Sequence, residues 1–341
     1  MSLVKICAIG AGRAGLVHVR NFVESVPQAK LVAVVDANRE AAEKAALDYQ
    51  IERVYADYRQ ALAEGGFDGV VITTPTFTHA EIAIAAAQAG MHVLCEKPMA
   101  LSLEECDQMI AAAQTSRVVF QLGFMRRFDS AFRNAKQRIL AGEIGKVMLV
   151  KSTGRGPGLP PRWACDIKKS HGMLAEVNSH DFDSVRWLSG SEYRRVYAEA
   201  DAFKCSDLKL EFPDFYDNAL VSCRMHSGAL AVIDGACPAD YGYDARVEIL
   251  GSEGVMLIGE LPHGAVSVCK KGTGIVRSTF PSWRDRFRQG YIEEDRHFVA
   301  CIQEGRPPEV TAQDGKMALQ AVIAANRSIV EARPIEIPFP D

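Results

Sequence analysis

Long uninterrupted apolar runs are missing from this sequence. None reaches the ~18–20 residues that a helix needs to span a bilayer, so we expect no membrane anchor. The first nine residues lead straight into a strand-like pattern, so we expect no signal peptide either. An excess of charge is also missing, because the formal net charge is -4 over 341 residues and the basic residues are scattered. This excludes the basic stripe of a nucleic-acid-binding protein.

Paired cysteines are missing too. The nine cysteines lie singly along the chain, without a CxxC motif, which argues against a disulfide framework or a zinc cluster. Most lie in apolar segments, where a thiol behaves as a small hydrophobe, so we expect a reducing, cytoplasmic location. Hydrophobic residues at 48% and charged residues at 24% are typical of a globular protein. The length suits two domains.

The first 122 residues alternate between strand-like and helical patterns. We expect strands at 4–9, 31–35, around 54, 68–73, 92–95 and 118–122, and helices ending near 24 and covering 39–47, 81–89 and 103–113. Strict alternation with continuously apolar strands predicts a doubly wound parallel sheet, the Rossmann architecture, covered by helices on both faces.

The pattern changes near residue 123. Helices are expected at 131–140, 179–188, 290–304 and 313–331, and strand-like runs at 193–202, 219–225, 229–235, 245–250, 254–258 and 265–270. Successive strands without crossover helices predict a large, mostly antiparallel open sheet. The fold class is therefore α/β followed by α+β. We assign residues 1–122 to an NAD(P)-binding Rossmann domain and 123–341 to a substrate-binding and oligomerisation domain.

A complete G-x-G-x-x-G motif follows the first strand and opens the first helix. It consists of Gly10, Ala11, Gly12, Arg13, Ala14 and Gly15. The first glycine permits a tight turn, the second lets the backbone approach a pyrophosphate, and the third allows close helix–strand packing. The helix N-terminus then offers N–H groups and a positive dipole end to the anion. This context predicts a dinucleotide site.

Asp36 ends the second strand, where the motif requires an acidic residue. Its carboxylate would accept hydrogen bonds from the adenosine ribose, which favours NAD over NADP because a 2′-phosphate would meet like charge. Arg39 lies three residues further on. It either offsets that charge, which leaves NADP possible, or is a solvated first-turn residue.

Two polar loops follow later strands of the predicted parallel sheet. One contains Thr73, Thr74, Pro75 and His79, and the other contains Glu96 and Lys97. Ligands of open α/β sheets bind outside the carboxyl ends of the strands. We therefore count these six residues in the cofactor site and expect Lys97 near the nicotinamide.

With these pieces in place, the chain resembles the family of glucose–fructose oxidoreductase, inositol dehydrogenase and rhizopine-catabolism oxidoreductases (Gfo/Idh/MocA). The resemblance rests on residues 10–15, 74–75 with 79, 96–98, 123–128, 171–183, 241–244, 248–251 and 314–315. These pieces span nearly the whole chain in the family's order. The resemblance implies hydride transfer between NAD(P) and a secondary alcohol of a cyclitol or sugar, in the manner of inositol 2-dehydrogenase.

The family's catalytic lysine and histidine correspond to Lys97 and His180. The resemblance implies that His180 is the general base and that the Lys97 ammonium orients the hydroxyl and stabilises the alkoxide. Where the family usually has aspartate four residues before this histidine, the chain has Glu176. If that segment is one helix, Glu176 and His180 share a face, and the carboxylate binds a substrate hydroxyl or raises the basicity of the histidine.

Four further residues are candidates for the substrate side, where aromatic rings and polar donors suit a polyol. The resemblance supports Arg127 and Tyr243, whereas Arg155 and Trp163 lie in a loop peculiar to this chain and are either ligands or loop anchors. A metal at Glu176, His180 and Asp183 is a weaker alternative, because no second histidine has ligand spacing, and we expect no metal.

Two other functions stay open beside the dehydrogenase. One is a catalytically silent nucleotide-binding regulator, since fold does not guarantee chemistry, although retention of Lys97 and His180 argues against it. The other is glycosidase-type chemistry through a keto sugar with tightly held NAD. We also expect a homodimer or homotetramer, because the second sheet has too many apolar residues to leave one face wet.

Overall fold

The computed structural model describes residues 2–259, 268–270, 274–276 and 280–338. Its contacts divide the chain into two compact units. Unit 1 runs to Phe128 and also includes Gln289–Leu319, and unit 2 comprises Asp129–Arg288 and the segment from Gln320 onward. Unit 1 therefore contains a late segment that the expected division at residue 123 assigned to the second domain.

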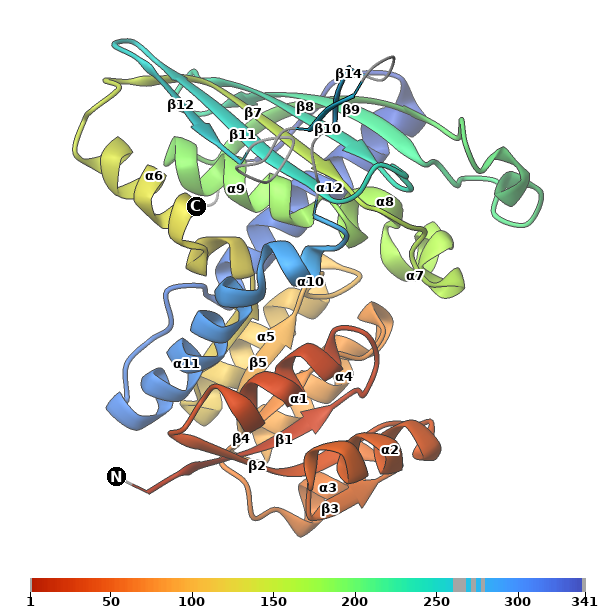
Figure 1. Ribbon diagram of the computed structural model, residues 1–341, viewed down its shortest axis with the longest axis vertical. Coiled ribbons are helices and arrows are strands. Elements are labelled where there is room, and N and C mark those ends of the chain that lie inside the picture. Colours follow the sequence, from red (N-terminus) through yellow and green to blue (C-terminus); the bar gives the residue numbers. More distant parts are fainter. Residues whose placement is uncertain (1, 260–267, 271–273, 277–279, 339–341) are drawn as a thin grey trace. The chain divides into compact units, whose positions relative to one another are not determined.

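Unit 1 is built on a six-stranded parallel sheet (Figure 1). Its strands are β1 (Val4–Ile9), β2 (Ala29–Val35), β3 (Arg53–Tyr55), β4 (Gly69–Ile72), β5 (His92–Glu96) and β6 (Phe120–Gly123). The spatial order is β3-β2-β1-β4-β5-β6, and every pairing is parallel. The predicted Rossmann sheet is confirmed.

Helices cover both faces of this sheet. On one face, α1 (Gly15–Glu24) and α2 (Arg39–Tyr49) share a core with the late helix α11 (Arg288–Glu304), which contributes Phe298 and Val299. On the other face lie α4 (His79–Gln88) and α5 (Leu103–Ser116), which pack on each other. A short helix that the sequence analysis missed, α3 (Tyr58–Glu64), links β3 to β4. The two apolar side chains of α11 explain why this segment belongs to unit 1.

Strand order places the polar loops of unit 1 along one edge. Successive strands are added to one side of β1 up to β3 and to its other side from β4 onward, so the strand order reverses between β1 and β4. Ligands of doubly wound sheets bind at this point. The glycine motif follows β1, Thr73 and Thr74 follow β4, and Lys97 follows β5. The three segments therefore lie at the carboxyl ends of neighbouring strands.

Unit 2 is built on a seven-stranded mixed sheet in the order β12-β11-β7-β10-β9-β8-β15. The strands are β7 (Val147–Arg155), β8 (Tyr193–Asp201), β9 (Asn218–Met225), β10 (Leu230–Ala236), β11 (Asp244–Gly251), β12 (Val255–Ile258) and β15 (Ile335–Glu336). Only the β7–β10 pairing in this sheet is parallel. The mostly antiparallel sheet is confirmed.

The sequence analysis missed strand β7, which lies inside this sheet between β11 and β10. Glycines at its carboxyl end made the segment resemble a loop, but they are required there by close packing, as described below. Of the strand expected at 265–270, residues 265–267 lie outside the described residues. Val268–Lys270 forms β13, which pairs with β14 (Gly274–Val276).

Helices cover one face of the unit 2 sheet. They are α6 (Ser130–Leu140), α8 (Gly172–Glu176), α9 (Ser179–Ser189) and the later half of α12 (Ala312–Glu331). Apolar side chains such as Val221, Ile233 and Ile249 are buried there. The opposite, open face mixes exposed Leu220 and Leu230 with charged residues. It is less apolar than the sequence suggested, because alternation sends most of the β-branched residues to the helical side.

Among the helices of the described residues, none combines the length and the apolarity needed to cross a bilayer.

Candidate active site

The glycine motif folds into a turn in which two positions accept only glycine. Gly10 has a φ of +110°, and a Cβ there would lie 2.6 Å from Thr73 Oγ1. A Cβ at Gly15 would lie 2.0 Å from the Gly10 carbonyl oxygen. The Thr73 hydroxyl donates to that same oxygen at 3.0 Å. The start of α1 therefore packs tightly against the ends of β1 and β4.

Gly12 differs from these two glycines, since a Cβ added there would meet no atom within 4 Å. Gly12 and Arg13 are exposed, Ala11 is buried and Ala14 is half-buried. No side chain caps the N-terminus of α1. The Leu16 and Val17 N–H groups donate within the turn, so an anion here would be met by the N–H groups that precede them. Open space beside a glycine at an uncapped helix start fits the pyrophosphate of a dinucleotide.

Asp36 closes the other side of this turn. Its Oδ2 accepts the Ala11 N–H at 2.8 Å, and its Oδ1 accepts the Asn38 N–H at 2.8 Å. A carboxylate has about four acceptor positions, so capacity remains for a ribose diol. Arg39 is exposed and pairs with Glu43 through a 2.8 Å contact between Nε and Oε1.

His79 joins the loops that follow β4 and β5. Its Nε2 lies 2.8 Å from the Thr74 carbonyl oxygen, and its Nδ1 lies 2.8 Å from the Pro98 carbonyl oxygen. Burial lowers the pKa of this imidazole, and a neutral ring carries one N–H, so only one of the two carbonyl oxygens accepts a hydrogen bond from it at a time. The Thr74 hydroxyl accepts from Thr78 at 2.7 Å. His79 therefore holds together the two loops that carry the other candidates.

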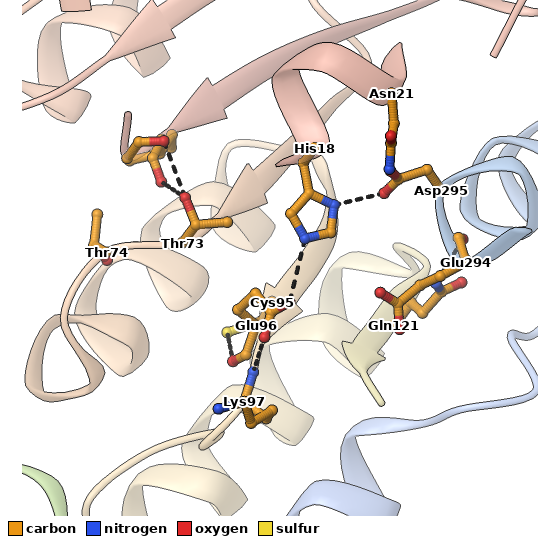
Figure 2. Close-up of polar contacts among 12 residues, drawn as sticks. His18, Asn21, Thr73, Thr74, Cys95, Glu96, Lys97, Gln121, Glu294 and Asp295 are labelled. Carbon is orange, nitrogen blue, oxygen red and sulfur yellow. Dashed lines mark hydrogen bonds and ion pairs between the residues drawn. The ribbon is translucent and has the colours of Figure 1, made fainter. Parts of the chain in front are cut away.

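Lys97 is half-buried and follows a glutamate that is only 4% exposed. Glu96 turns back so that its Oε2 accepts the Lys97 backbone N–H at 3.0 Å, while its Oε1 lies 3.2 Å from His18 Nε2 (Figure 2). The hydrogen bond and charge of His18 overcome burial and lower the pKa of Glu96. Glu96 is thus an internal anion beside the main chain of Lys97.

Arg127 lies in unit 1, after β6, and is almost completely buried. Its guanidinium donates to Asp314 Oδ1 at 3.0 Å, and Asp314 lies in the first turn of α12, in the part of that helix that belongs to unit 1. The Asp314 Oδ2 also accepts from the Thr311 backbone and hydroxyl. The substrate role predicted for Arg127 stays a prediction.

In unit 2, Glu176 and His180 do not lie on one continuous helix. Helix α8 ends at Glu176, a turn follows, and α9 begins at Ser179. The condition for a shared helix face, one helix through both residues, is therefore not met. Backbone N–H groups of both Val177 and Asn178 return to the Met173 carbonyl oxygen, at 2.9 and 3.3 Å, and this ends α8. His180 is buried in the first turn of α9.

The turn before His180 is fixed to the centre of the sheet by residues that the sequence analysis did not single out. Asn178 Nδ2 donates to the Gly154 carbonyl oxygen and to Asp181 Oδ2, both at 2.9 Å, and Ser152 donates to Asp181 Oδ1 at 2.6 Å. A Cβ at Gly154 would lie 1.9 Å from Asp181 Oδ2. On the neighbouring strand, a Cβ at Gly235 would lie 2.3 Å from Asn178 Oδ1. Two adjacent strand glycines therefore let this turn lie flat on the sheet.

The remaining candidates of unit 2 lie on three different segments. Arg155 alternates with Gly154 and so faces the opposite side of the sheet from the His180 turn, where its guanidinium pairs with Asp234. Trp163 is half-buried in a short 3₁₀ turn (Arg162–Cys165). Tyr243 is buried, with its ring edge-on to Phe287 at 6.0 Å between centroids. The structure does not bring Arg155 and His180 together.

Among the described residues, one group of three potential metal ligands has its ligand atoms within 4.8 Å of one another. It consists of His18, Glu96 and Glu294, and it differs from the alternative set of Glu176, His180 and Asp183.

Comparison with known proteins assigns both halves of the chain. The family model described as "Oxidoreductase family, NAD-binding Rossmann fold" matches residues 4–124, and that described as "GFO/IDH/MocA C-terminal domain" matches residues 132–257. The chain is 37% identical over 335 residues to scyllo-inositol 2-dehydrogenase (NAD(+)) of Bacillus subtilis, an alignment that covers 98% of this chain and 96% of that protein. It is 33% identical to Myo-inositol 2-dehydrogenase of Thermotoga maritima, with 98% of each chain covered.

A solved structure agrees along the whole length. Scyllo-inositol dehydrogenase from Lactobacillus casei, crystallised with NAD(H) and scyllo-inositol, superimposes with a TM-score of 0.91 at 27% identity. The superposition covers 98% of this chain and 99% of that one.

Proposed function

Because this chain belongs to the Gfo/Idh/MocA oxidoreductase family, we propose that it is an NAD-dependent inositol 2-dehydrogenase. The reaction is hydride transfer between the nicotinamide and a secondary alcohol carbon of a cyclitol. The observation that carries this proposal is full-length similarity to inositol 2-dehydrogenases, at 37% and 33% identity. Likeness over 98% of the chain to an enzyme that holds NAD(H) and scyllo-inositol supports the same cofactor and substrate class.

The glycine turn and Asp36 form the cofactor site in this proposal. The pyrophosphate lies beside Gly12 and the start of α1, and the Asp36 carboxylate accepts from the ribose diol. The pairing of Arg39 with Glu43 supports NAD over NADP, because the guanidinium is directed to an acid on its own helix. Thr73, Thr74 and Pro75 line the neighbouring edge.

Lys97 and His180 carry the proton chemistry in the proposal. Bound NAD supplies the hydride acceptor. The Lys97 ammonium donates a hydrogen bond to the reacting hydroxyl and stabilises its oxygen as the proton leaves, and His180 accepts that proton. Glu176, at the end of α8, binds a neighbouring hydroxyl of the ring. Its extra methylene relative to the family's usual aspartate changes which hydroxyl it reaches.

Arg127, Trp163 and Tyr243 are the remaining substrate candidates. Tyr243 and Trp163 offer aromatic faces to the C–H surface of a cyclitol, and Arg127 offers donors to its hydroxyls. Arg155 is the weakest of the four, because its guanidinium is already paired with Asp234 on the opposite sheet face. A structural link between the carboxyl ends of β7 and β10 is the better role for it.

The homodimer or homotetramer also belongs to this proposal. The open face of the unit 2 sheet exposes Leu220 at 57%, Leu230 at 45% and Leu257 at 70%, and packing against a second copy would remove these side chains from water. Sedimentation at micromolar concentration tests it, and a 37.3 kDa particle would reject it. The cytoplasmic location stays a prediction, which cell fractionation would test.

An activity screen tests the function. The protein is incubated with NAD and a panel of inositols, hexoses and sugar acids while the absorbance of reduced nicotinamide is followed. We expect the fastest reduction with an inositol. No reduction with any member would favour the silent regulator, and cleavage of a glycoside without accumulation of reduced cofactor would favour the keto-sugar glycosidase.

A further inference from the structure

A cluster of buried polar residues lies in unit 1 next to Lys97, and of its members only Glu96 was expected in the cofactor site. Its members come from four elements: α1, which opens at the glycine turn, the end of β5, β6 and α11 (Figure 2). All its members are at most 4% exposed. They are His18, Asn21, Glu96, Gln121, Glu294 and Asp295.

His18 stands at the centre of this buried cluster. Its Nδ1 lies 2.7 Å from Asp295 Oδ1, and its Nε2 lies 3.2 Å from Glu96 Oε1. Glu96, whose pKa is lowered, only accepts hydrogen bonds, so Nε2 donates to it. Burial raises the pKa of Asp295, and where Asp295 is ionised as well, both ring nitrogens carry protons and the ring is an imidazolium. Burial alone would lower the pKa of His18, but the two carboxylates outweigh it and raise the pKa well above its usual value.

Asp295 fixes the imidazolium from the far side. Its second oxygen, Oδ2, accepts from Asn21 Nδ2 at 2.9 Å, so both oxygens are held by side chains of α1. A carboxylate that orients a histidine fixes both the ring plane and the proton positions. The imidazolium therefore has one orientation in which it can donate to Glu96.

Glu96 connects the oriented His18 ring to the backbone of Lys97. One carboxylate oxygen accepts from His18, and the other accepts the Lys97 backbone N–H at 3.0 Å. The carboxylate can satisfy both donors only in one position relative to the end of β5. A continuous hydrogen-bonded chain thus runs from α11 through His18 to the main chain of Lys97.

We propose that His18 is a positioning residue for Lys97: it holds the Glu96 carboxylate, which sets the direction in which the Lys97 side chain leaves the end of β5. This inference rests on the proposed function for its catalytic consequence. Its structural content, the orientation of Lys97, does not depend on the substrate. His18 lies on α1. Its contact with Glu96 therefore also sets the position of Lys97 relative to the helix that begins at the glycine turn.

A metal ion is the competing interpretation of this cluster, since ligand atoms of His18, Glu96 and Glu294 lie within 4.8 Å of one another. A metal needs the lone pair of a neutral imidazole, whereas His18 Nε2 faces Glu96 as a donor. Within the described part of the chain, neither carboxylate oxygen of Glu294 has a hydrogen-bond partner. Burial and the charge of Glu96 raise the pKa of Glu294 well above its usual value, so a proton neutralises it.

The test compares His18→Gln with a matched control, Asn21→Leu. Asn21→Leu removes one donor to Asp295 and leaves His18 in place. His18→Gln replaces the ring that bridges Asp295 and Glu96 by an amide, whose single nitrogen cannot donate to both carboxylates. We expect His18→Gln to lower kcat at saturating NAD and inositol at least about tenfold, because a misplacement of about 1 Å costs a catalytic group up to about 100-fold. The Kd for NAD, from quenching of protein fluorescence, should change less than about threefold. Asn21→Leu should keep kcat within about twofold.

A second variant and a second readout keep the two proposals separate. Asp295→Asn preserves shape but removes the anion that orients the ring, and it should lower kcat in the same direction if His18→Gln does not fold. Acetylation of Lys97, quantified by mass spectrometry against Lys44 in the same sample, reports the exposure of its ammonium without any substrate. An altered Lys97 rate in His18→Gln together with no inositol turnover in the unchanged protein would reject the proposed function and support the positioning role.

Three results would overturn the inference. One is an unchanged kcat in both His18→Gln and Asp295→Asn. Another is an equal loss of kcat in Asn21→Leu, which would mean that the cluster serves only stability. The third is a stoichiometric metal in the purified protein whose removal by a chelator changes Lys97 acetylation as much as His18→Gln does.

Discussion

Replacing Gly12 by alanine separates the fold of the glycine turn from its function. A Cβ at this position meets no atom within 4 Å, and the φ of Gly12 does not lie in the left-handed region. The folded turn therefore accepts alanine without strain. Because alanine also restricts the unfolded chain, the free energy of unfolding should rise by about 0.4–1 kcal/mol.

The cofactor should respond in the opposite way. The added methyl lies where the pyrophosphate approaches the backbone, so the Kd for NAD should rise at least tenfold, or about 1.4 kcal/mol. Urea unfolding gives the stability, and quenching of protein fluorescence by NAD gives the Kd. Each is measured on the same preparation.

Gly15→Ala is the matched control. Its Cβ would lie 2.0 Å from the Gly10 carbonyl oxygen and 2.7 Å from Thr73 Oγ1, and such overpacking costs typically about 1–3 kcal/mol of stability. An unchanged NAD affinity in Gly12→Ala would refute the reasoning, since the pyrophosphate would then bind elsewhere. Equal destabilisation by both changes would mean that the turn has another shape.

Three further predictions concern single side chains of unit 1. Asp36→Ala should weaken NAD binding more than NADP binding, and equal weakening in a titration with both nucleotides would mean that the ribose is held elsewhere. Lys97→Ala should lower turnover by about 100-fold or more with an unchanged unfolding curve, and full turnover would remove this lysine from the mechanism. Glu294→Gln should change how the free energy of unfolding depends on pH. In the folded protein Glu294 keeps its proton, whereas the unfolded chain releases this proton above pH ~4.3. The free energy of unfolding of the unchanged protein therefore falls as the pH rises towards the raised pKa of Glu294. The variant has no titrating group at this position. Its stability relative to the unchanged protein should therefore increase by up to about 1.4 kcal/mol per pH unit in that range. Urea unfolding at several pH values measures this difference, and a difference that does not depend on pH would contradict the prediction.

Short-range sequence patterns predicted the elements that form through contacts between residues close in the sequence. Alternating apolar runs and helices gave the parallel sheet, and the glycine motif gave a turn at the reversal point of that sheet, where β1 and β4 meet. Successive strand-like runs without crossover helices predicted the antiparallel sheet, and the resemblance added the family. These features follow from periodicity and backbone sterics over a few tens of residues.

Long-range packing decided what the sequence did not predict. Helix α11 returns to unit 1 because Phe298 and Val299 complete its core, and no local signal marks that. Strand β7 was missed because Gly154 resembles a loop residue, although Asp181 requires the missing Cβ there. The histidine three residues after the glycine motif was a signal for His18, but its partner Asp295 is 277 residues away.

The break between α8 and α9, beside the proposed catalytic histidine, is another case in which long-range packing decided the local structure. Spacing of four residues suggested that Glu176 and His180 share a helix face, and the sequence there contains no glycine or proline to interrupt a helix. The interruption comes from Asn178, which bonds to the Gly154 carbonyl oxygen on β7 and to Asp181. Tertiary contacts therefore overrode the local helical preference.

The most direct test of the central claim uses an inositol labelled with deuterium at the reacting carbon. The protein is mixed with NAD and this substrate, and the reduced cofactor is analysed by mass spectrometry. Direct hydride transfer predicts a reduced nicotinamide that carries the deuterium from the substrate. Reduced cofactor without deuterium, or no reduced cofactor with any labelled inositol, would contradict the account.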